Sequence, residues 1–391
     1  MRIFVMLSRI PWPLEKGDKL RAFNQIKCLA KRHEVILCAI NDDAKVDKMK
    51  AFAALQPYCA SVNFIDIRKA GILFNLGRAF LTGMPMQCGY FFNSRAKAKV
   101  HRLIAKYKPD MLFGQLLRVA PYLIDENIPK TLDYQDVFSM GMKRRMDVAS
   151  YVKKPVFRME YNRLRRYERE VFDRFDVKTI ICDADRRFID HERRNEILIV
   201  PNGVDHQYYT PRDCEKKYDV VFSGNMSYPP NVDAVEYMSR EILPIVWKTL
   251  PNTTFYAAGA TPDARVKNCA NDRVIVSGWL DDMREAYAQS RVFIAPMRIG
   301  TGLQNKLLEA MSMGLPSITT PLANDSLGAE NGSEILVGSN AEELARHIIT
   351  LLTDNDKAGR IAKAGFDFTN RVYDWDKATR IMEAAMEAAV R

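Results

Sequence analysis

The stretch 296–311, PMRIGTGLQNKLLEAM, combines glycines and cations in a pattern suited to an anionic ligand. Gly300 and Gly302 permit a close approach of backbone N–H groups to a phosphate. The helix expected after them adds roughly half a positive charge at its N-terminus. Arg298 and Lys306 flank the glycines, and two such cations can neutralise a diphosphate. The stretch therefore predicts phosphate binding.

A carboxylate follows the second cation at helical spacing. Glu309 lies three residues after Lys306, so both side chains share one helix face. A carboxylate there can accept hydrogen bonds from both hydroxyls of a ribose, which makes the whole stretch a candidate nucleoside-diphosphate site. The alternative is that the glycines only shape a loop and that Glu309 pairs with Lys306 at the surface.

Two common nucleotide motifs are missing. The chain has no GxxxxGK[ST], which counts against a P-loop enzyme, and no GxGxxG after its first apolar run, which counts against a dehydrogenase.

Short apolar runs alternate with helical patterns along the chain, which is typical of parallel sheets with right-handed crossovers. The expected strands are 3–7, 34–40, 61–67, 111–114, 130–132, 177–182, 197–200, 220–223, 254–258, 273–277, 292–295, 317–320 and 335–337. The expected helices between them are 20–31, 96–107, 232–249, 282–290, 305–313 and 342–353. The fold class is therefore α/β, with two Rossmann-like domains.

Pro201-Asn202-Gly203 interrupts the alternation and is the expected hinge. We expect an amino-terminal domain over 1–201, a carboxyl-terminal domain over 202–373, and a last helix over 374–391 that returns to the first domain. Residues 1–200 hold 38 Lys and Arg against 23 Asp and Glu, whereas the remainder is acidic. The basic segment 143–174 is expected to be one exposed helix.

Composition excludes several classes of protein. The chain is 47% hydrophobic and 27% charged, as in an ordinary globular protein. Its seven cysteines form no CxxC pair and its five histidines are isolated, so we expect no metal site. It has no run of about 18 apolar residues, and the opening MRIFVMLS lacks a cleavage pattern. We therefore expect a cytoplasmic location.

Several further motifs carry a resemblance that covers most of the chain. They are IVPNGVD at 199–205, FSGN at 222–225, VSGW at 276–279, and LEAM at 308–311 followed by GLP at 314–316. Together with the glycine loop they resemble family 4 retaining glycosyltransferases, which have the GT-B fold of two facing Rossmann domains. The segments 11–21, 219–234 and 302–306 are similar to a subgroup that includes exosortase-associated sugar transferases.

The resemblance implies roles for the carboxyl-terminal loops. Glu309 matches the second glutamate of the family's E-x7-E motif and is expected to hold the ribose. The first glutamate falls at Thr301, so the motif is incomplete and the sugar stays open. Asn225 stands in a loop that often carries cations, so we assign that charge to Arg298 and Lys306. Trp279 and Leu280 match the loop that usually receives the base, the alternative for Trp279 being a core or edge aromatic. The residues expected to bind the donor are Gly17, Lys19, Gly224, Asn225, Trp279, Leu280, Gly300, Thr301, Gly302, Leu303 and Glu309.

The resemblance also implies an acceptor side in the amino-terminal half. Gly17 is expected to approach the donor phosphate. Asp18 is either site chemistry or the N-cap of the next helix. Asp136, in the sequence DYQD after a short strand, is expected to orient the acceptor hydroxyl, the alternative being a turn or cap. The residues expected to bind the acceptor are Asp18, Arg21, Gln115 and Arg118, and the catalytic ones are Lys306, Arg298 and Asp136.

The expected activity is therefore sugar transfer from a UDP- or GDP-sugar to an acceptor hydroxyl, with retention and without a metal or other cofactor. We expect a glycan or lipid-linked acceptor in cell-surface polysaccharide synthesis. The apolar segments 72–81 and 90–92 are compatible with docking of a lipid-linked acceptor and peripheral contact with the inner face of the cytoplasmic membrane, the alternative being that they pack under the amino-terminal sheet. Two alternatives remain: a nucleotide-sugar 2-epimerase of the same fold, and a non-enzymatic, basic membrane-surface protein. No nucleic-acid-binding motif is evident.

Overall fold

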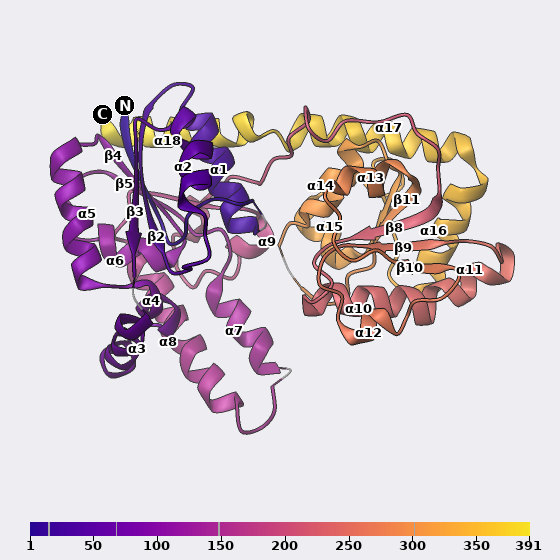
Figure 1. The fold of residues 1–391 in the computed structure, drawn as a ribbon, viewed down its shortest axis with the longest axis horizontal. Coiled ribbons are helices and arrows are strands. Elements are labelled where there is room, and N and C mark those ends of the chain that lie inside the picture. Colours follow the sequence, from indigo (N-terminus) through magenta and orange to yellow (C-terminus); the bar gives the residue numbers. More distant parts are fainter. Residues whose placement is uncertain (15, 68, 148, 301) are drawn as a thin grey trace. The chain divides into compact units, whose positions relative to one another are not determined.

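The chain divides into two compact units, each built on one sheet (Figure 1). The computed structural model describes residues 1–14, 16–67, 69–147, 149–300 and 302–391. Unit 1 comprises Met1–Pro201 and Trp375–Arg391, and unit 2 comprises Asn202–Asp374. The paired strands of both sheets run parallel, and helices follow the strands in alternation. This confirms the predicted α/β fold with two Rossmann-like domains.

Unit 1 has a seven-stranded sheet in the order β3-β2-β1-β4-β5-β6-β7. The chain moves outward from β1 in one direction and then returns to continue from β4, so the order reverses between these two strands. Ligands of open α/β sheets bind at such a reversal, beyond the carboxyl ends of the strands. The strands are β1 (Arg2–Leu7), β2 (Glu34–Asn41), β3 (Ser61–Asp66), β4 (Met111–Gln115), β5 (Lys130–Asp133), β6 (Val177–Ile180) and β7 (Leu198–Ile199).

The helices of unit 1 cover both faces of this sheet. They are α1 (Gly17–Leu29), α2 (Lys48–Leu55), α3 (Lys69–Thr82), α4 (Met86–Phe91), α5 (Ser94–Tyr107), α6 (Ala120–Leu123), α7 (Phe138–Asp147), α8 (Lys154–Phe172), α9 (Asp183–Arg186) and α18 (Trp375–Val390). Strand β1 shows why two layers are needed, because its side chains alternate between the faces. Ile3 and Val5 share a buried cluster with residues of α1 and α18, whereas Phe4 and Met6 share one with residues of α5 and α8.

Unit 2 repeats this topology with six strands in the order β10-β9-β8-β11-β12-β13. Its strands are β8 (Tyr218–Ser223), β9 (Phe255–Ala258), β10 (Val274–Val276), β11 (Ser290–Ala295), β12 (Ser317–Thr319) and β13 (Leu336–Val337). Its helices are α10 (Pro229–Tyr237), α11 (Leu243–Thr249), α12 (Ala264–Lys267), α13 (Met283–Ala288), α14 (Asn305–Ser312), α15 (Pro321–Leu327), α16 (Ala341–Thr353) and α17 (Asn355–Val372). The order again reverses between the first and fourth strands of the unit, β8 and β11.

The last helix, α18, belongs to unit 1 although 173 residues of unit 2 precede it. Ala378, Met382 and Met386 of α18 are buried in the cluster that includes Ile26 and Leu29 of α1. The pattern places one small and two flexible apolar side chains on a single helix face, which fills the groove beside α1.

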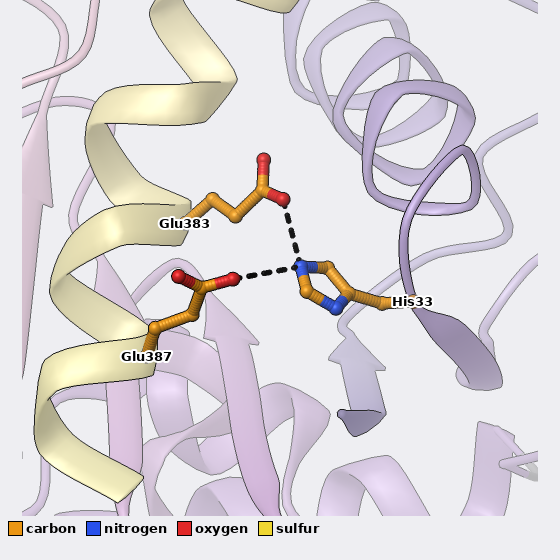
Figure 2. Close-up of side chains that lie close together, drawn as sticks. All are labelled: His33, Glu383 and Glu387. Carbon is orange, nitrogen blue, oxygen red and sulfur yellow. Dashed lines mark hydrogen bonds and ion pairs between the residues drawn. The ribbon is translucent and has the colours of Figure 1, made fainter. Parts of the chain in front are cut away.

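Ion pairs reinforce this packing. Arg32 donates to both oxygens of Glu383, at 2.6 and 2.8 Å from its Nε atom. Figure 2 shows that His33 points toward Glu383 and Glu387, which lie on successive turns of α18, with distances of 2.9 and 4.0 Å. Because Arg32 already engages Glu383, these carboxylates act as an ion-pair network rather than as free metal ligands.

The basic segment 143–174 differs from the expectation of one exposed helix. It contains the end of α7 and the whole of α8, and these two helices pack against each other. Two of its acids are buried rather than solvated. Glu160 accepts hydrogen bonds from the backbone N–H groups of Met86 and Gln87 at the start of α4. Glu168 accepts from the N–H and hydroxyl of Ser139, and burial raises its pKa to about 7. Spacing alone did not reveal these capping partners.

Among the described helices, none is both apolar enough and long enough to cross a bilayer.

The Arg32–Glu383 contact predicts an acid-dependent loss of stability. Burial opposes ionisation of Glu383, but hydrogen bonds from Arg32 outweigh it, so the pKa of Glu383 lies below its ordinary value. A lowered carboxyl pKa stabilises the fold above the unfolded-state pKa and loses that effect as pH falls through the folded-state value. We expect Glu383→Gln to lower the free energy of unfolding by about 2 kcal/mol at pH 7, and by progressively less below about pH 4.

Denaturant unfolding at pH 7, 5 and 3 measures this difference. The matched control is Asp367→Asn, because Asp367 pairs with Lys363 on the exposed side of α17 and should change stability by under about 0.5 kcal/mol. An equal difference between wild type and Glu383→Gln at pH 7 and pH 3 would contradict the assignment.

Candidate functional site

The loops after β8 and β9 touch through their backbones at the reversal of the unit 2 sheet. Gly224 follows β8 with φ +152°, and Gly259 follows β9 with φ +151°. A Cβ atom added to Gly259 would lie 1.7 Å from the carbonyl oxygen of Gly224. Only glycine allows this approach, because both the conformation and the space exclude a side chain. The two loops therefore form a backbone surface directly beyond the central strand.

Lys306 reaches this surface from the first turn of α14. A Cβ atom on Gly224 would lie 3.1 Å from the Lys306 Nζ atom. The ammonium donates to Asn231 Oδ1 at 2.6 Å and lies 4.3 Å from the centre of the Phe222 ring. Asn231 in turn donates through Nδ2 to the carbonyl of Asn225 at 2.8 Å. Lys306 is thus fixed beside the loop that follows the first strand of the unit.

The contacts of Lys306 do not neutralise its charge. Its amide and aromatic partners are uncharged, and no carboxylate among the described residues forms an ion pair with it. Burial lowers the pKa of Lys306 to about 7, while the charge of Glu309 partly opposes this effect. A buried cation without a counter-ion costs free energy. An anionic ligand at this position would supply the missing charge.

Glu309 lies one helical turn further along α14 and is oriented by two tyrosines. Tyr287 donates its hydroxyl to Glu309 Oε2 at 2.7 Å, and Tyr209 donates as well. The hydroxyls of Ser223 and Tyr287 are 2.7 Å apart, so Ser223 donates to the tyrosine oxygen. Burial raises the pKa of Glu309, against these hydrogen bonds and the charge of Lys306. This relay connects the end of β8 to the carboxylate expected to hold a ribose.

Arg298 makes different contacts from those expected. Its guanidinium binds Asp233 at 2.9 and 3.1 Å and Glu241 at 3.0 Å, and it stacks 4.1 Å from the Tyr237 ring centre. Two carboxylates therefore already compensate its charge. The side chains of Arg298 and Lys306 both attach to α10, but through different residues. For Arg298 to neutralise a diphosphate, these ion pairs must break, so its catalytic role stays a prediction.

The remaining predicted donor residues of unit 2 surround the same loops. Gly300 and Gly302 have φ of +112° and +78°, which suits glycine, and Leu303 packs against the core. The carboxamide oxygen of Asn225 accepts from Ser227 and Thr261. Thr301 lies outside the described residues.

The loop after β10 carries the predicted contacts to a base. Trp279 is 65% exposed, and its indole N–H donates to Asp281 Oδ1 at 3.0 Å. Leu280 is half-buried against the core. An exposed indole held at its edge is available for stacking, and its role in binding a base stays a prediction.

In unit 1, the start of α1 decides between the two interpretations of Asp18, site chemistry or N-cap. The helix begins at Gly17, and its N-cap position is Lys16, so the N-cap interpretation of Asp18 is wrong. Asp18 lies in the first turn and forms an ion pair with Arg9 at 3.1 Å. Lys19 donates to the carbonyl oxygen of Trp12 at 3.3 Å.

Two predicted acceptor residues turn out to be internal. Arg21 is fully buried and binds Asp133 through two hydrogen bonds of 2.6 and 3.0 Å. Thr179 donates to the same carboxylate at 2.9 Å. Gln115 is also buried and donates to the carbonyl of Asp18 at 3.2 Å. Neither side chain is open to solvent, which disfavours a direct contact with an acceptor, and the acceptor role of Arg21 and Gln115 stays a prediction.

Arg118 and Asp136 are accessible at the carboxyl edge of the unit 1 sheet. Arg118 is partly buried between the rings of Phe91 and Phe138, at 5.0 and 4.9 Å from their centres. Asp136 is exposed to solvent, but the surrounding protein removes part of the water around its carboxyl group. This desolvation, and then the charge of Asp185, raises the pKa of Asp136 to about 6. Its contact with an acceptor stays a prediction.

Four residues that shape the unit 2 site were not predicted from the sequence. Gly259 directly follows an expected strand, and a glycine there was a usable signal. Asn231, Tyr209 and Tyr287 act through partners distant in sequence, so spacing carried no sign of them.

The close approach of the two glycine loops predicts the effect of a single methyl group. Gly259→Ala must separate the loops, so we expect it to lower the free energy of unfolding by about 3 kcal/mol or more. Gly278→Ala is the matched control, because φ is +72° but nothing lies within 4 Å of the new Cβ. It should cost only the conformational strain of about 1–2 kcal/mol. Equal losses in denaturant unfolding would rule out the steric explanation.

Comparison with known proteins follows the same division of the chain. Residues 217–354 match the family model described as "Glycosyl transferases group 1". A Klebsiella pneumoniae relative, described as an uncharacterized 44.6 kDa protein in cps region, is 21% identical over 96% of this chain and 97% of its own.

Solved structures extend the likeness to the whole chain. Anabaena Alr3699/HepE in complex with UDP is similar with a TM-score of 0.72 and 14% identity, covering 99% of this chain and 100% of that one. Sucrose-phosphate synthase from Thermosynechococcus elongatus has a TM-score of 0.69 and 15% identity, covering 99% of both chains. The chain therefore has the GT-B fold, and residues 217–354 form a group 1 glycosyltransferase domain.

Proposed function

We propose that this chain is a metal-independent, retaining glycosyltransferase of family 4 that uses a nucleoside-diphosphate sugar. The observation that carries the proposal is the ammonium of Lys306, which lies beside the backbone of Gly224 and forms no ion pair with any carboxylate in the described part of the chain. A diphosphate placed there would receive this charge together with backbone N–H groups at the start of α14. The complex of the similar Anabaena structure with UDP supports a uridine or related nucleotide.

The proposed chemistry is stabilisation of a departing diphosphate. As the glycosidic bond breaks, negative charge develops on the leaving phosphate, and a fixed cation with preorganised N–H groups stabilises it. Lys306 acts on this charge, while Glu309 holds the ribose hydroxyls through a carboxylate already oriented by Tyr287. The acceptor hydroxyl attacks on the same face and passes its proton to the leaving phosphate. This scheme assigns no side chain as a base and needs no divalent cation.

The biological setting we propose is cell-surface polysaccharide synthesis. The description of the Klebsiella relative as a protein in a cps region supports it. The acceptor is then a growing glycan or a lipid-linked sugar. The 2-epimerase alternative gains no support from the family model, which describes transferases. The exosortase-associated subgroup remains a finer proposal, carried by the segments 11–21, 219–234 and 302–306.

A lipid-linked acceptor also fits the surface of α3. Leu73, Phe74 and Leu81 are 76%, 75% and 86% exposed, and their spacing places them on neighbouring parts of one helix face. Arg163 of α8 donates to the carbonyl of Phe80 at 2.9 Å, which puts a cation beside this apolar surface. We propose that these residues contact the membrane peripherally.

Vesicle sedimentation tests the membrane contact. The double variant Leu73→Asp, Leu81→Asp should lose most binding to vesicles with anionic lipid, because its apolar area is removed. Met49→Asp is the control, since Met49 on α2 is 84% exposed but distant in sequence from α3. Binding by wild type should weaken at high salt. Equal sedimentation of the double variant and wild type would contradict the contact.

Calorimetric titration tests the donor site through two separable variants. Lys306→Met removes the phosphate cation and should weaken UDP binding by about 100-fold, with little effect on uridine. Glu309→Gln should weaken both uridine and UDP, because the ribose contact is common to them. Lys363→Met is the control for loss of a lysine. Wild-type affinity in both site variants would exclude this location, and a parallel titration of GDP and ADP identifies the base.

The lowered pKa of Lys306 adds a pH dependence. The amine is charged below about pH 7 and neutral above it, so diphosphate affinity should fall as pH rises above 7. Lys306→Met should remove most of this slope. An unchanged slope in the variant would assign the titration to another group. Donor turnover that persists in EDTA, with the starting anomer retained in the first product seen by NMR, would test metal independence and retention.

A further inference from the structure

Two arginines of unit 1 follow the strands between which the strand order of its sheet reverses. This position corresponds to the reversal between β8 and β11 in unit 2. Strands β1 and β4 pair directly, with Leu7 opposite Gln115. Arg9 follows the first of these strands and Arg118 follows the second. Their guanidinium groups lie 5.3 and 5.0 Å from the centre of one ring, that of Phe91. The fold therefore gathers two like charges where an α/β sheet binds its ligand.

Arg118 has no direct counter-ion among the described residues. Its Nη2 atom donates to the neutral Gln87 Oε1 at a long 3.4 Å. Its Nε atom is buried and has no hydrogen-bond partner in the described parts of the chain. Asp18 and Asp42 are near enough to favour its charge, but Asp18 bonds Arg9 and Asp42 accepts from Tyr90. Burial, and then the charge of Arg9, lowers the pKa of Arg118.

Ring stacking alone does not account for this arrangement. Stacking of a guanidinium over aromatic rings contributes less free energy than a buried cation loses when it lacks a hydrogen-bonded counter-ion. The guanidinium of Arg118 has the planar fork of N–H donors that binds carboxylates and phosphates. Among the described residues, its Nε donor is unused and its Nη2 donor makes only the long bond to Gln87.

We propose that Arg9 and Arg118 form an oxyanion subsite on unit 1, so that the acceptor carries a carboxylate, as in an acidic sugar, or a phosphate, as in a lipid diphosphate. Naming the ligand as the acceptor rests on the proposed function, whereas the subsite itself does not. Both guanidinium groups stack on the ring of Phe91, which positions them. Asp18 orients Arg9 through their ion pair.

The test uses the full chain in the Lys306→Met background, which removes the phosphate cation of unit 2. Calorimetry at fixed ionic strength compares pyrophosphate, methyl glucuronide and the neutral methyl glucoside. We expect one of the two oxyanions to bind and the glucoside not to bind. Adding Arg118→Gln should weaken oxyanion binding at least tenfold, and Arg118→Lys should weaken it less, because charge remains but the fork is lost.

Arg163→Gln is the matched control, since Arg163 also stacks on a ring, that of Phe80, and should leave binding unchanged. Thermal unfolding of each ligand-free variant checks that it folds. A preference for methyl glucuronide identifies a carboxylate, and a preference for pyrophosphate identifies a phosphate. No saturable binding of either oxyanion, or equal binding by the glutamine and wild-type residues, would overturn the subsite.

UDP binding with Lys306 intact separates this proposal from the proposed function. Arg118→Gln should bind UDP as wild type does. If it loses UDP, Arg118 belongs to the donor site and the subsite is wrong. If wild type itself binds no nucleoside diphosphate while the oxyanion still binds, the proposed function fails and the subsite stands.

Discussion

The structure of unit 2 depends on a close backbone contact at the point where its strand order reverses. Gly224 and Gly259 can touch only because neither has a side chain, and their contact leaves a polar backbone surface beyond β8. Asn231 holds Lys306 beside that surface, and no described carboxylate forms an ion pair with it. The ligand-free fold thus tolerates an unfavourable charge at one defined place. Under the proposed function, a bound anion would offset the stability lost there.

The acid and the cation of α14 owe their positions to different partners. Glu309 depends on a relay from Ser223 through Tyr287, and Lys306 depends on α10. Ser223 lies in β8, and Asn231 bonds the loop that follows β8, so the first strand of the unit positions the residues of both proposed contacts, to phosphate and to ribose. Unit 1 uses the same topology, with Arg118 lying beyond the corresponding edge. A repeated fold has therefore placed an incompletely paired cation at equivalent points of two sheets.

The sequence was sufficient for the fold because buried parallel strands are nearly continuous apolar runs. The thirteen strands found among the described residues all lie within or overlap the expected ranges, and glycines after strands indicated the loops. Helices such as α3 and α17 were not predicted, because no clear boundary in the apolar pattern set them apart from the neighbouring segments. The tail illustrates the limit of local patterns, because its ion-pair partner Arg32, just after α1, lies more than 340 residues away.

Individual side chains were harder to assign, since their roles depend on long-range neighbours. Arg21 and Arg118 are both arginines near strand ends, yet Arg21 is buried against Asp133, whereas Arg118 forms no ion pair with a described carboxylate. The sequence suggested that Arg298 is a free cation, but it pairs with Asp233 of α10 and with Glu241 in the turn that follows α10. Charge type and spacing predicted where cations gather, but only the packing of α10 and β5 decided which of them are compensated.

The central claim is that a nucleoside diphosphate binds at the reversal point of the unit 2 sheet. Hydrogen–deuterium exchange of the full chain with and without UDP tests it most directly. The account predicts slower exchange in residues 222–231, 258–262 and 302–309 when UDP is present, with smaller changes in the other loops of unit 2. Unchanged exchange in these three segments at saturating UDP would contradict it.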